Sequence, residues 1–232
     1  MLRPRSLFDV EPYRARSVRH AASRQAGPPT LVLGSTQPAE LIDQGAATER
    51  GIDVARRRGG GGAVFLPADG YLWVDAWVPR VDPLWDEDVT RAAAAVGAWW
   101  AAALVGLGLP AGSLEVHQGR PVPGPWGRLV CFAGRGPGEL FLQGRKLMGL
   151  SQWRSKEGSL FSACVYARWD PEPLAALLAG DAAVPPPGVS DLVPLAVGLD
   201  DLVPPGPSLA DLQTALLTSF PAWGRSHLPS PD

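Results

Sequence analysis

The sequence predicts an α/β or α+β domain in which a mixed β-sheet is flanked by helices. Short apolar strand patterns are interspersed with a few helix patterns, an arrangement typical of these fold classes. The chain has 232 residues, of which 46% are hydrophobic and 19% are charged, so one sizeable core is expected. The formal net charge of −2 argues against a general nucleic-acid-binding protein, which would be basic.

The first half of the chain predicts strands at residues 30–34, 52–55, 63–66 and 71–78, where bulky apolar residues cluster or alternate. Pro38 suits a first helical turn and opens a helix predicted at 37–50. A longer helix is predicted at 86–105, because Asp86 and Asp88 lie where the helix dipole favours acidic residues. Polar residues interrupt its apolar stretch, so we interpret it as a buried amphipathic helix and expect no membrane span.

After Pro110 the pattern changes to short strands. They are predicted at 114–117, 128–132, 139–143, 146–152 and 159–167, with Gly144 and Arg145 as a hairpin turn. Helices are predicted at 170–178 and 208–220, the second opened by a capping pattern at Ser208 and Asp211. The Pro-rich residues 181–207 between these helices are predicted to form an extended connector.

These elements divide the chain into a basic arm or first strand at 1–28, a catalytic core at 29–180, and a Pro-rich connector with a C-terminal helix at 181–232. The N-terminus is basic but lacks the apolar region of a signal peptide. Two cysteines make no disulfide framework, and no Cys/His spacing predicts a metal site. A cytoplasmic location with free thiols is therefore expected.

A run of four glycines, Gly59 to Gly62, follows three arginines and separates two predicted strands. Glycines allow close approach of the backbone, and their successive N–H groups can form a cradle for an anion beside the arginines. The run lacks the spacing of a dinucleotide-binding loop and the Lys-Ser/Thr of a P-loop. It predicts either an anion-binding loop or a flexible surface loop.

Cys131 and Lys146 are the candidate catalytic pair. Cys131 ends a predicted strand and enters a Gly/Pro loop, and Lys146 follows a hairpin turn that can bring it back toward that loop. A cation near a thiol lowers the thiol pKa and favours the nucleophilic thiolate. The alternatives are a small buried hydrophobic residue for Cys131 and a solvated side chain for Lys146. Cys164 is interpreted as a buried structural thiol.

Several segments together carry a family resemblance. Residues 31–37 end in Gly-x-x-Gln, residues 56–64 are similar to Arg-Arg-x-Ser-Gly-Gly-Gly-Ala-Val, and residues 144–154 are similar to Gly-x-Lys-(Ile/Val)-x-Gly-x-x-Gln-x-Arg. In this order they resemble the lipoate/octanoate branch of the biotin/lipoate protein ligase family. The segment from Cys131-Phe132 to Glu139-Leu140 is also similar to one in the amidating octanoyltransferases, as is the interval of fifteen positions from Cys131 to Lys146. The resemblance covers about residues 30–180.

The resemblance implies a single catalytic domain, similar to lipoate ligases, whose sheet encloses an acyl pocket. It assigns catalytic roles to Cys131 and Lys146 and no metal ligand. Binding of the acyl donor or adenylate is assigned to Arg56, Arg57, Gly60, Gly61, Gly62, Ala63, Gly149 and Gln152. The chain departs from the family pattern at Gly59, where the family has serine, and at Leu66, where it commonly has histidine.

Three functions follow from the resemblance. The first is an acyltransferase that takes an octanoyl or lipoyl group from acyl carrier protein as a thioester on Cys131, and passes it to a lysine of a lipoyl domain with no cofactor. The second is a lipoate–protein ligase that uses ATP and magnesium to form lipoyl-AMP. The third, suggested by Gly59 and Leu66, is a non-catalytic relative that binds acyl groups or lipoyl domains. No nucleic-acid or membrane partner is expected.

Overall fold

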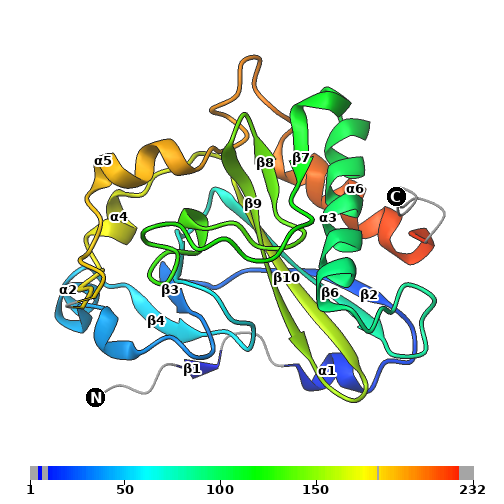
Figure 1. Ribbon diagram of the computed structural model, residues 1–232, viewed down its shortest axis with the longest axis horizontal. Coiled ribbons are helices and arrows are strands. Elements are labelled where there is room, and N and C mark those ends of the chain that lie inside the picture. The colour runs from blue at the N-terminus through cyan, green and yellow to red at the C-terminus, as the bar shows by residue number, and fades with distance from the viewer. Residues whose placement is uncertain (1–4, 7–9, 182, 225–232) are drawn as a thin grey trace.

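The computed structural model describes residues 5–6, 10–181 and 183–224, and shows two β-sheets with helices around them (Figure 1). The smaller sheet has the order β1 (Arg5–Ser6), β4 (Asp53–Arg56), β3 (Thr30–Leu33), β5 (Val64–Leu66). The larger has the order β2 (His20–Arg24), β6 (Tyr71–Pro79), β10 (Gly158–Tyr166), β9 (Arg145–Arg154), β8 (Leu140–Leu142), β7 (Leu114–Val116). The predicted α/β fold class is confirmed, and the mixed sheet is the smaller one, since all pairs in the larger sheet are antiparallel.

The helices lie around the edges and faces of these sheets. They are α1 (Glu11–Arg14), α2 (Gln44–Glu49), α3 (Val89–Gly106), α4 (Glu172–Ala175), α5 (Val189–Leu192) and α6 (Leu209–Ser219). Short 3₁₀ helices are η1 (Ala39–Leu41), η2 (Ala111–Ser113), η3 (Cys131–Ala133), η4 (Val193–Leu195) and η5 (Phe220–Ala222). The helices α3 and α6 flank the larger sheet, whereas α2, α4 and α5 lie beside the smaller one (Figure 1).

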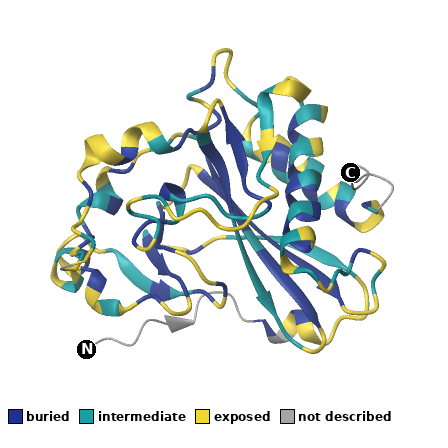
Figure 2. Cartoon of the chain, viewed as in Figure 1, coloured by how far each residue is buried: buried dark blue, intermediate teal, exposed yellow. Residues whose placement is uncertain are grey.

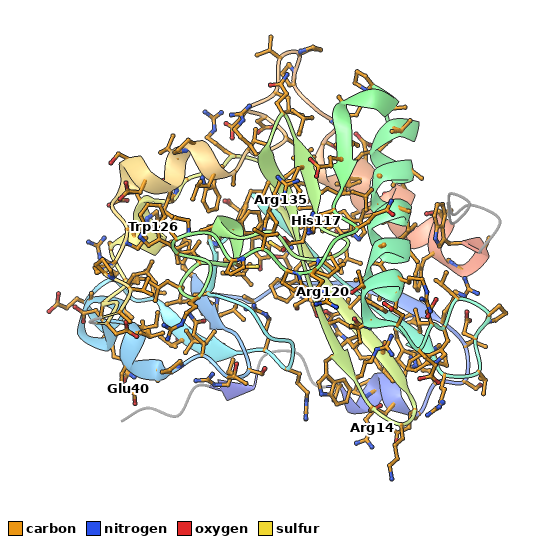
Figure 3. All side chains as sticks on the ribbon, viewed as in Figure 1. Arg14, Glu40, His117, Arg120, Trp126 and Arg135 are labelled. Atoms are coloured by element: carbon orange, nitrogen blue, oxygen red, sulfur yellow. The ribbon has the colours of Figure 1, made fainter. Side chains whose placement is uncertain are left out.

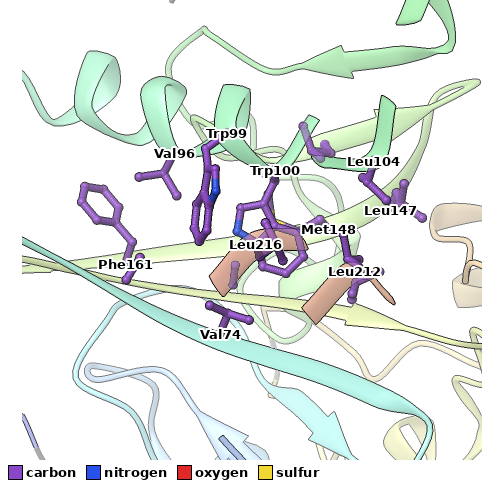
Figure 4. Close-up of a cluster of buried hydrophobic side chains, with 14 of the residues drawn as sticks. Val74, Val96, Trp99, Trp100, Leu104, Leu147, Met148, Phe161, Leu212 and Leu216 are labelled. Atoms are coloured by element: carbon purple, nitrogen blue, oxygen red, sulfur yellow. The ribbon is translucent and has the colours of Figure 1, made fainter. Parts of the chain in front are cut away.

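One hydrophobic core lies between the larger sheet and α3 and α6. Trp99 and Trp100 of α3 are 1% and 0% exposed and pack against sheet residues such as Phe161 and against Leu212 of α6 (Figure 4). Asp88 caps α3, because its carboxylate accepts hydrogen bonds from the N–H groups of Thr90 (2.8 Å) and Arg91 (3.0 Å). By length and composition alone α3 could cross a membrane, a test that core helices also pass, and its buried side chains face this core.

A second core fills the space between the two sheets. It joins buried residues of β3, such as Leu31 and Leu33, to Trp73 of β6 and to Cys164 and Tyr166 of β10. In Figure 2 the central strands of the larger sheet and much of β3 are coloured as buried. Cys164 is 3% exposed, so the prediction of a buried thiol is confirmed. The candidate site lies at the edge of this second core.

Several predicted elements differ from the structure. The helix predicted at 37–50 is divided into η1 and α2, because Ile42 is extended and Asp43 caps α2 by accepting from the N–H of Ala46 (2.9 Å). The helix predicted at 170–178 is only the short α4. In the predicted strand 128–132, only Val130 forms a bridge, to Ala63, before η3 begins.

The β8–β9 hairpin and the C-terminal segment also correct the predictions. The turn is Gln143-Gly144, one residue earlier than predicted, and both residues have positive φ (52° and 79°), as a tight two-residue turn requires. The predicted connector 181–207 contains α5 and η4, and its residues 196–199 are buried. Within it Val197 donates its N–H to the carbonyl of Lys146 (3.0 Å). In the segment predicted as an arm or first strand, Arg5–Ser6 forms β1 and His20–Arg24 forms β2 at an edge of the larger sheet, and residues 1–4, 7–9, 182 and 225–232 lie outside the described part.

Candidate functional site

The glycine run, η3 and β9 meet at one end of the space between the sheets. The run, residues 59–62, connects β4 to β5 of the smaller sheet, and η3 begins at Cys131. The Cys131 N–H donates to the carbonyl of Ala63 (3.0 Å), which places the cysteine directly beside the end of the glycine run. The segment between β7 and β8 carries Cys131 and crosses in front of the sheets, with Trp126, His117 and Arg135 along it (Figure 3).

Arg56 and Arg57 hold the backbone around the glycine run. The Arg57 guanidinium is buried and donates to the carbonyls of Gly60 (2.6 Å), Gly62 (2.9 Å) and Val32 (3.3 Å). Arg56 Nη1 donates to the carbonyls of Gly34 (2.6 Å) and Gln37 (2.7 Å). Both arginines therefore organise the loop in this structure by donating to protein carbonyls.

The glycines permit contacts that no side chain would allow. A Cβ atom on Gly34 would lie 1.9 Å from the carbonyl oxygen of Gly61, and one on Gly62 would lie 2.6 Å from the carbonyl carbon of Val130. Gly60 and Gly61 are exposed, and within the described part of the chain their N–H groups donate to no protein acceptor. These two amides could donate to an anion, and anion binding by the loop stays a prediction.

Gln37 and Gly149 fix the position of Cys131 from two sides. The buried Gln37 side chain donates through Nε2 to the carbonyl of Leu129 (2.9 Å), two residues before Cys131. A Cβ atom on Gly149 would lie 3.2 Å from the Phe132 ring and 3.5 Å from Cys131 Sγ, so only glycine leaves ordinary space there. A cavity lined by Cys131, Phe132, Gly149 and Arg57 measures about 10 Å³. It has room for about one water molecule.

Lys146 is buried, at 1% exposure, and its ammonium group has two close partners. Nζ lies 2.6 Å from Oε2 of Glu139 and donates to the carbonyl oxygen of Cys131 (2.6 Å). It also lies 5.7 Å from the ring centroids of Phe132 and of Phe141. The alternative that Lys146 is a solvated side chain is therefore wrong, and the prediction that the hairpin returns it to the cysteine loop is confirmed.

A β-bulge in the β8–β9 pair places Lys146 and Gly149 together. Phe141 pairs with Lys146 and the preceding Leu140 pairs with Met148, so β9 has one extra residue. Leu147 and Met148 therefore both enter the core beneath α3, and Lys146 and Gly149 both contact η3. In a regular strand, residues three apart would point to opposite faces.

The same bulge separates Gln152 from the other predicted site residues. A regular strand would place Lys146 and Gln152 on one face, because they are six residues apart. Instead the Gln152 amide, in the orientation that satisfies its hydrogen bonds, donates to the Val89 carbonyl (3.1 Å) and accepts from Arg154 Nε (2.8 Å) at the start of α3. The structure thus brings together the glycine run, Arg57, Ala63, Cys131, Lys146 and Gly149, and leaves Gln152 on the other side of the sheet.

Burial and charge act in opposite directions on the Cys131 thiol. Burial raises its pKa above the ordinary value, Lys146 and Arg57 lower it, and the Glu139 carboxylate raises it, with burial the largest effect. Lys146 lowers the pKa of the thiol, as expected for a nearby cation, and the larger effect of burial leaves that pKa above its ordinary value. The raised pKa favours the protonated form of the Cys131 thiol at neutral pH.

We expect the rate at which iodoacetamide alkylates Cys131 to be low at neutral pH and to keep rising above pH 9, because the pKa of this thiol is raised. Only the thiolate reacts, and a raised pKa moves its appearance to higher pH. The measurement is peptide mass mapping across a pH series. The same protein unfolded in urea is the control, because its thiols should titrate near the model-peptide value of about 8.5. If the alkylation rate of Cys131 reaches half its maximum at or below the pH found for the unfolded chain, its pKa is not raised.

Glu139 is a site residue that the sequence reasoning did not single out. It is 3% exposed, and besides Lys146 it accepts from the backbone N–H groups of Gly136 and Leu150 (3.3 Å). Burial raises the pKa of its carboxyl, and Lys146 and the two N–H groups lower it. The sequence feature that could have identified Glu139 is its place in the segment that is similar to the octanoyltransferases.

The departures from the family pattern fit the packing. A Cβ atom on Gly59 would lie 2.7 Å from Ser151 Oγ, so a serine at position 59 requires β9 or the loop to shift. Leu66 is 0% exposed and belongs to the core between the sheets. The chain therefore presents an apolar core residue where the family commonly has histidine. Among the described residues no group of three or more His, Cys, Asp or Glu side chains could hold a metal ion.

An open groove of about 510 Å³ lies away from these residues, between the end of α3, the β8–β9 turn and residues 201–207. Its lining includes Leu109, Gln143 and Val203 and none of the residues around Cys131. The chemistry-bearing side chains are thus at the small cavity rather than at the large groove.

Residues 24–221 match the family model of the lipoyl protein ligase A/B catalytic domain. No curated protein matches the chain. A bipartite lipoate protein ligase from Thermoplasma acidophilum, described with its E2 lipoyl domain, is 19% identical over 90% of this chain and 73% of its own, with a TM-score of 0.68. A T. acidophilum structure with bound lipoic acid is 20% identical over 91% and 76%, with a TM-score of 0.65. Lipoate-protein ligase A bound with ATP is 21% identical over 90% and 74%, with a TM-score of 0.64.

Proposed function

Because the chain belongs to the lipoyl protein ligase A/B catalytic-domain family, we propose that it transfers an octanoyl or lipoyl group to a lysine of a lipoyl domain through a thioester on Cys131. One observation carries the proposal: the backbone of Cys131 is hydrogen-bonded to Ala63 at the end of the glycine run, and the buried Lys146 ammonium donates to the carbonyl of the same cysteine. A lipoyl-domain acceptor is supported by the T. acidophilum ligase described with its E2 lipoyl domain.

The first half-reaction moves the acyl group to the protein. The Cys131 sulfur attacks the thioester carbonyl of an acyl carrier protein, a new carbon–sulfur bond forms, and the bond to the donor sulfur breaks. The proton of the Cys131 thiol passes to the departing donor thiolate, so the donor leaves as a thiol. The Lys146 ammonium and the free amides of Gly60 and Gly61 are the groups present to stabilise negative charge on the carbonyl oxygen.

The second half-reaction moves the acyl group to the acceptor. The amine of a lipoyl-domain lysine attacks the Cys131 thioester, an amide bond forms, and the bond to sulfur breaks. The amine proton returns to the cysteine, which is restored as the protonated thiol favoured by its burial. A thioester intermediate divides one acyl transfer into two steps with lower barriers.

A second function, an ATP-dependent lipoate ligase, is favoured by one finding: lipoate-protein ligase A bound with ATP has the same fold. The N–H groups of Gly60 and Gly61 fit an adenylate phosphate, because they are exposed and engaged by no described protein acceptor. Arg57 would support them by holding the loop. When bound, ATP with magnesium would activate the carboxyl group of a free acid. In the thioester donor, the acyl group is already activated.

The third possibility, a relative that binds acyl groups or lipoyl domains without catalysis, rests on Gly59 and Leu66. Gly59 removes a hydroxyl from the loop, and Leu66 replaces a polar ring with a buried alkyl group.

The two free thiols, Cys131 and Cys164, suit a reducing compartment, and a cytoplasmic location belongs to the proposal.

Intact-mass spectrometry distinguishes these functions. The protein is incubated with octanoyl-acyl carrier protein, or with lipoate, ATP and magnesium, each with and without a lipoyl domain. We expect octanoyl-acyl carrier protein alone to add one octanoyl group to the protein, and the lipoyl domain then to acquire it. Lipoylation that requires ATP and proceeds without a protein adduct would support the ligase instead. Binding of a lipoyl domain without turnover of either donor would support the non-catalytic relative.

A further inference from the structure

We propose that Glu139 is a positioning residue that holds the Lys146 ammonium against the cysteine loop. The inference rests on the proposed acyl transfer, to which it adds a residue outside the cysteine–lysine pair. Its basis is the buried ion pair of Glu139 with Lys146, whose N–O separation is 2.6 Å.

The Glu139 carboxylate is held in place by backbone groups of two segments. Oε2 accepts from the N–H of Gly136, and Oε1 accepts from the N–H of Leu150 in β9 (3.3 Å). The backbone of Glu139 is also fixed, since its carbonyl accepts from the N–H of His117 (2.9 Å). The carboxylate orientation is therefore set by the fold, independently of Lys146.

Lys146 depends on Glu139 in turn. Its ammonium is 1% exposed, and the charged form of a buried amine is strongly disfavoured unless an opposite charge is near. Among the described residues, Nζ also contacts the carbonyl of Cys131 and lies near the rings of Phe132 and Phe141. A neutral carbonyl and two rings compensate a buried charge less well than a carboxylate does.

The consequence for Cys131 has a definite sign. Lys146 lowers the pKa of the Cys131 thiol more than Glu139 raises it, so the pair together favours the thiolate. If Glu139 acts by holding the Lys146 ammonium beside Cys131, removing the carboxylate also weakens the larger favourable effect and makes the thiol less reactive. If Glu139 acted on the thiol directly, removing its negative charge would make the thiol more reactive.

The test is the rate of Cys131 alkylation by iodoacetamide at fixed pH, which needs no acyl donor, in E139Q, E139D, K146M and the double variant E139Q/K146M. We expect E139Q to slow alkylation, and E139D, which keeps the charge, to restore most of the rate. The double variant should react no more slowly than K146M alone, because Glu139 then has no ammonium to hold. E115Q is the matched control, since Glu115 lies on the exposed edge strand β7 and pairs only with Arg135 among the described residues.

Melting temperature gives a second readout. E139Q and K146M should each melt about 5 °C or more below the wild type, because each leaves one buried charge without its partner. The double variant should lose clearly less than the sum of the two shifts, which keeps the test valid if a single variant folds poorly. Faster or unchanged alkylation in E139Q, or fully additive shifts, would overturn the inference.

The acyl-transfer readout separates this inference from the proposed function. We expect E139Q to slow formation of the octanoyl adduct at least about tenfold, with rescue by E139D. The variants could change the alkylation rate as expected while the wild-type protein accepts no acyl group from any donor. That result would refute the proposed transfer and support the role of Glu139 in holding Lys146.

Discussion

Replacing Cys131 with alanine is expected to lower the rate of acyl transfer from acyl carrier protein by at least about three orders of magnitude, because the alanine has no nucleophile. The loop itself should survive the change. The backbone N–H of residue 131 donates to the carbonyl of Ala63, and its backbone carbonyl accepts from Lys146. Neither hydrogen bond involves the side chain that is replaced. The rate is measured as transfer of the octanoyl group to a lipoyl domain, and the melting temperature confirms that the variant is folded.

The octanoyl adduct on the protein should disappear in the same variant. The matched comparison is Cys164→Ala, which removes the other thiol of the small cavity. Burial raises the pKa of Cys164 well above its ordinary range, so this thiol is not a competing nucleophile and the adduct should persist without it. If Cys131→Ala retains the adduct or most of the transfer rate, the thioester mechanism is wrong. ATP-dependent lipoylation that survives in Cys131→Ala would identify the ligase.

The sequence predicted those parts of the site that consecutive residues build. The glycine run lies between two strands because its position follows from local apolar patterns at 52–55 and 63–66. The return of Lys146 toward Cys131 follows from a hairpin, which adjacent turn residues predict. The turn is Gln143-Gly144, one residue earlier than predicted. Such features depend on backbone conformation within a few residues, which residue types record directly.

The parts that the sequence did not predict depend on distant pairing. Nothing in residues 146–152 records the β-bulge, because it arises where β9 meets the shorter β8. Without that bulge, the pattern assigns Gln152 to the face of Lys146, and the structure places it against the start of α3. The pKa of Cys131 also depends on burial between two sheets, and a count of nearby cations cannot supply that.

Substitution of Arg57 with methionine is expected to destabilise the protein by about 3 kcal/mol or more, because it leaves the carbonyls it held without a charged donor. Those carbonyls belong to Gly60 and Gly62 in the loop and to Val32 in β3, and the guanidinium is 4% exposed. Arg57→Lys should recover only part of the loss, since an ammonium group cannot reproduce the planar fork that reaches three carbonyls. Urea unfolding measures both variants.

Arg58 offers a matched control at the next position. It is exposed, and its guanidinium lies over the Trp153 ring at 5.4 Å, so Arg58→Met should cost about 1 kcal/mol or less. Because Arg57 fixes the carbonyls that orient the exposed amides of Gly60 and Gly61, Arg57→Met should also weaken donor binding, even when assayed well below its unfolding midpoint. Equal losses of stability in the two variants would show that the loop does not depend on the buried guanidinium. Normal stability of Arg57→Met with lost donor binding would instead indicate that Arg57 contacts the donor itself.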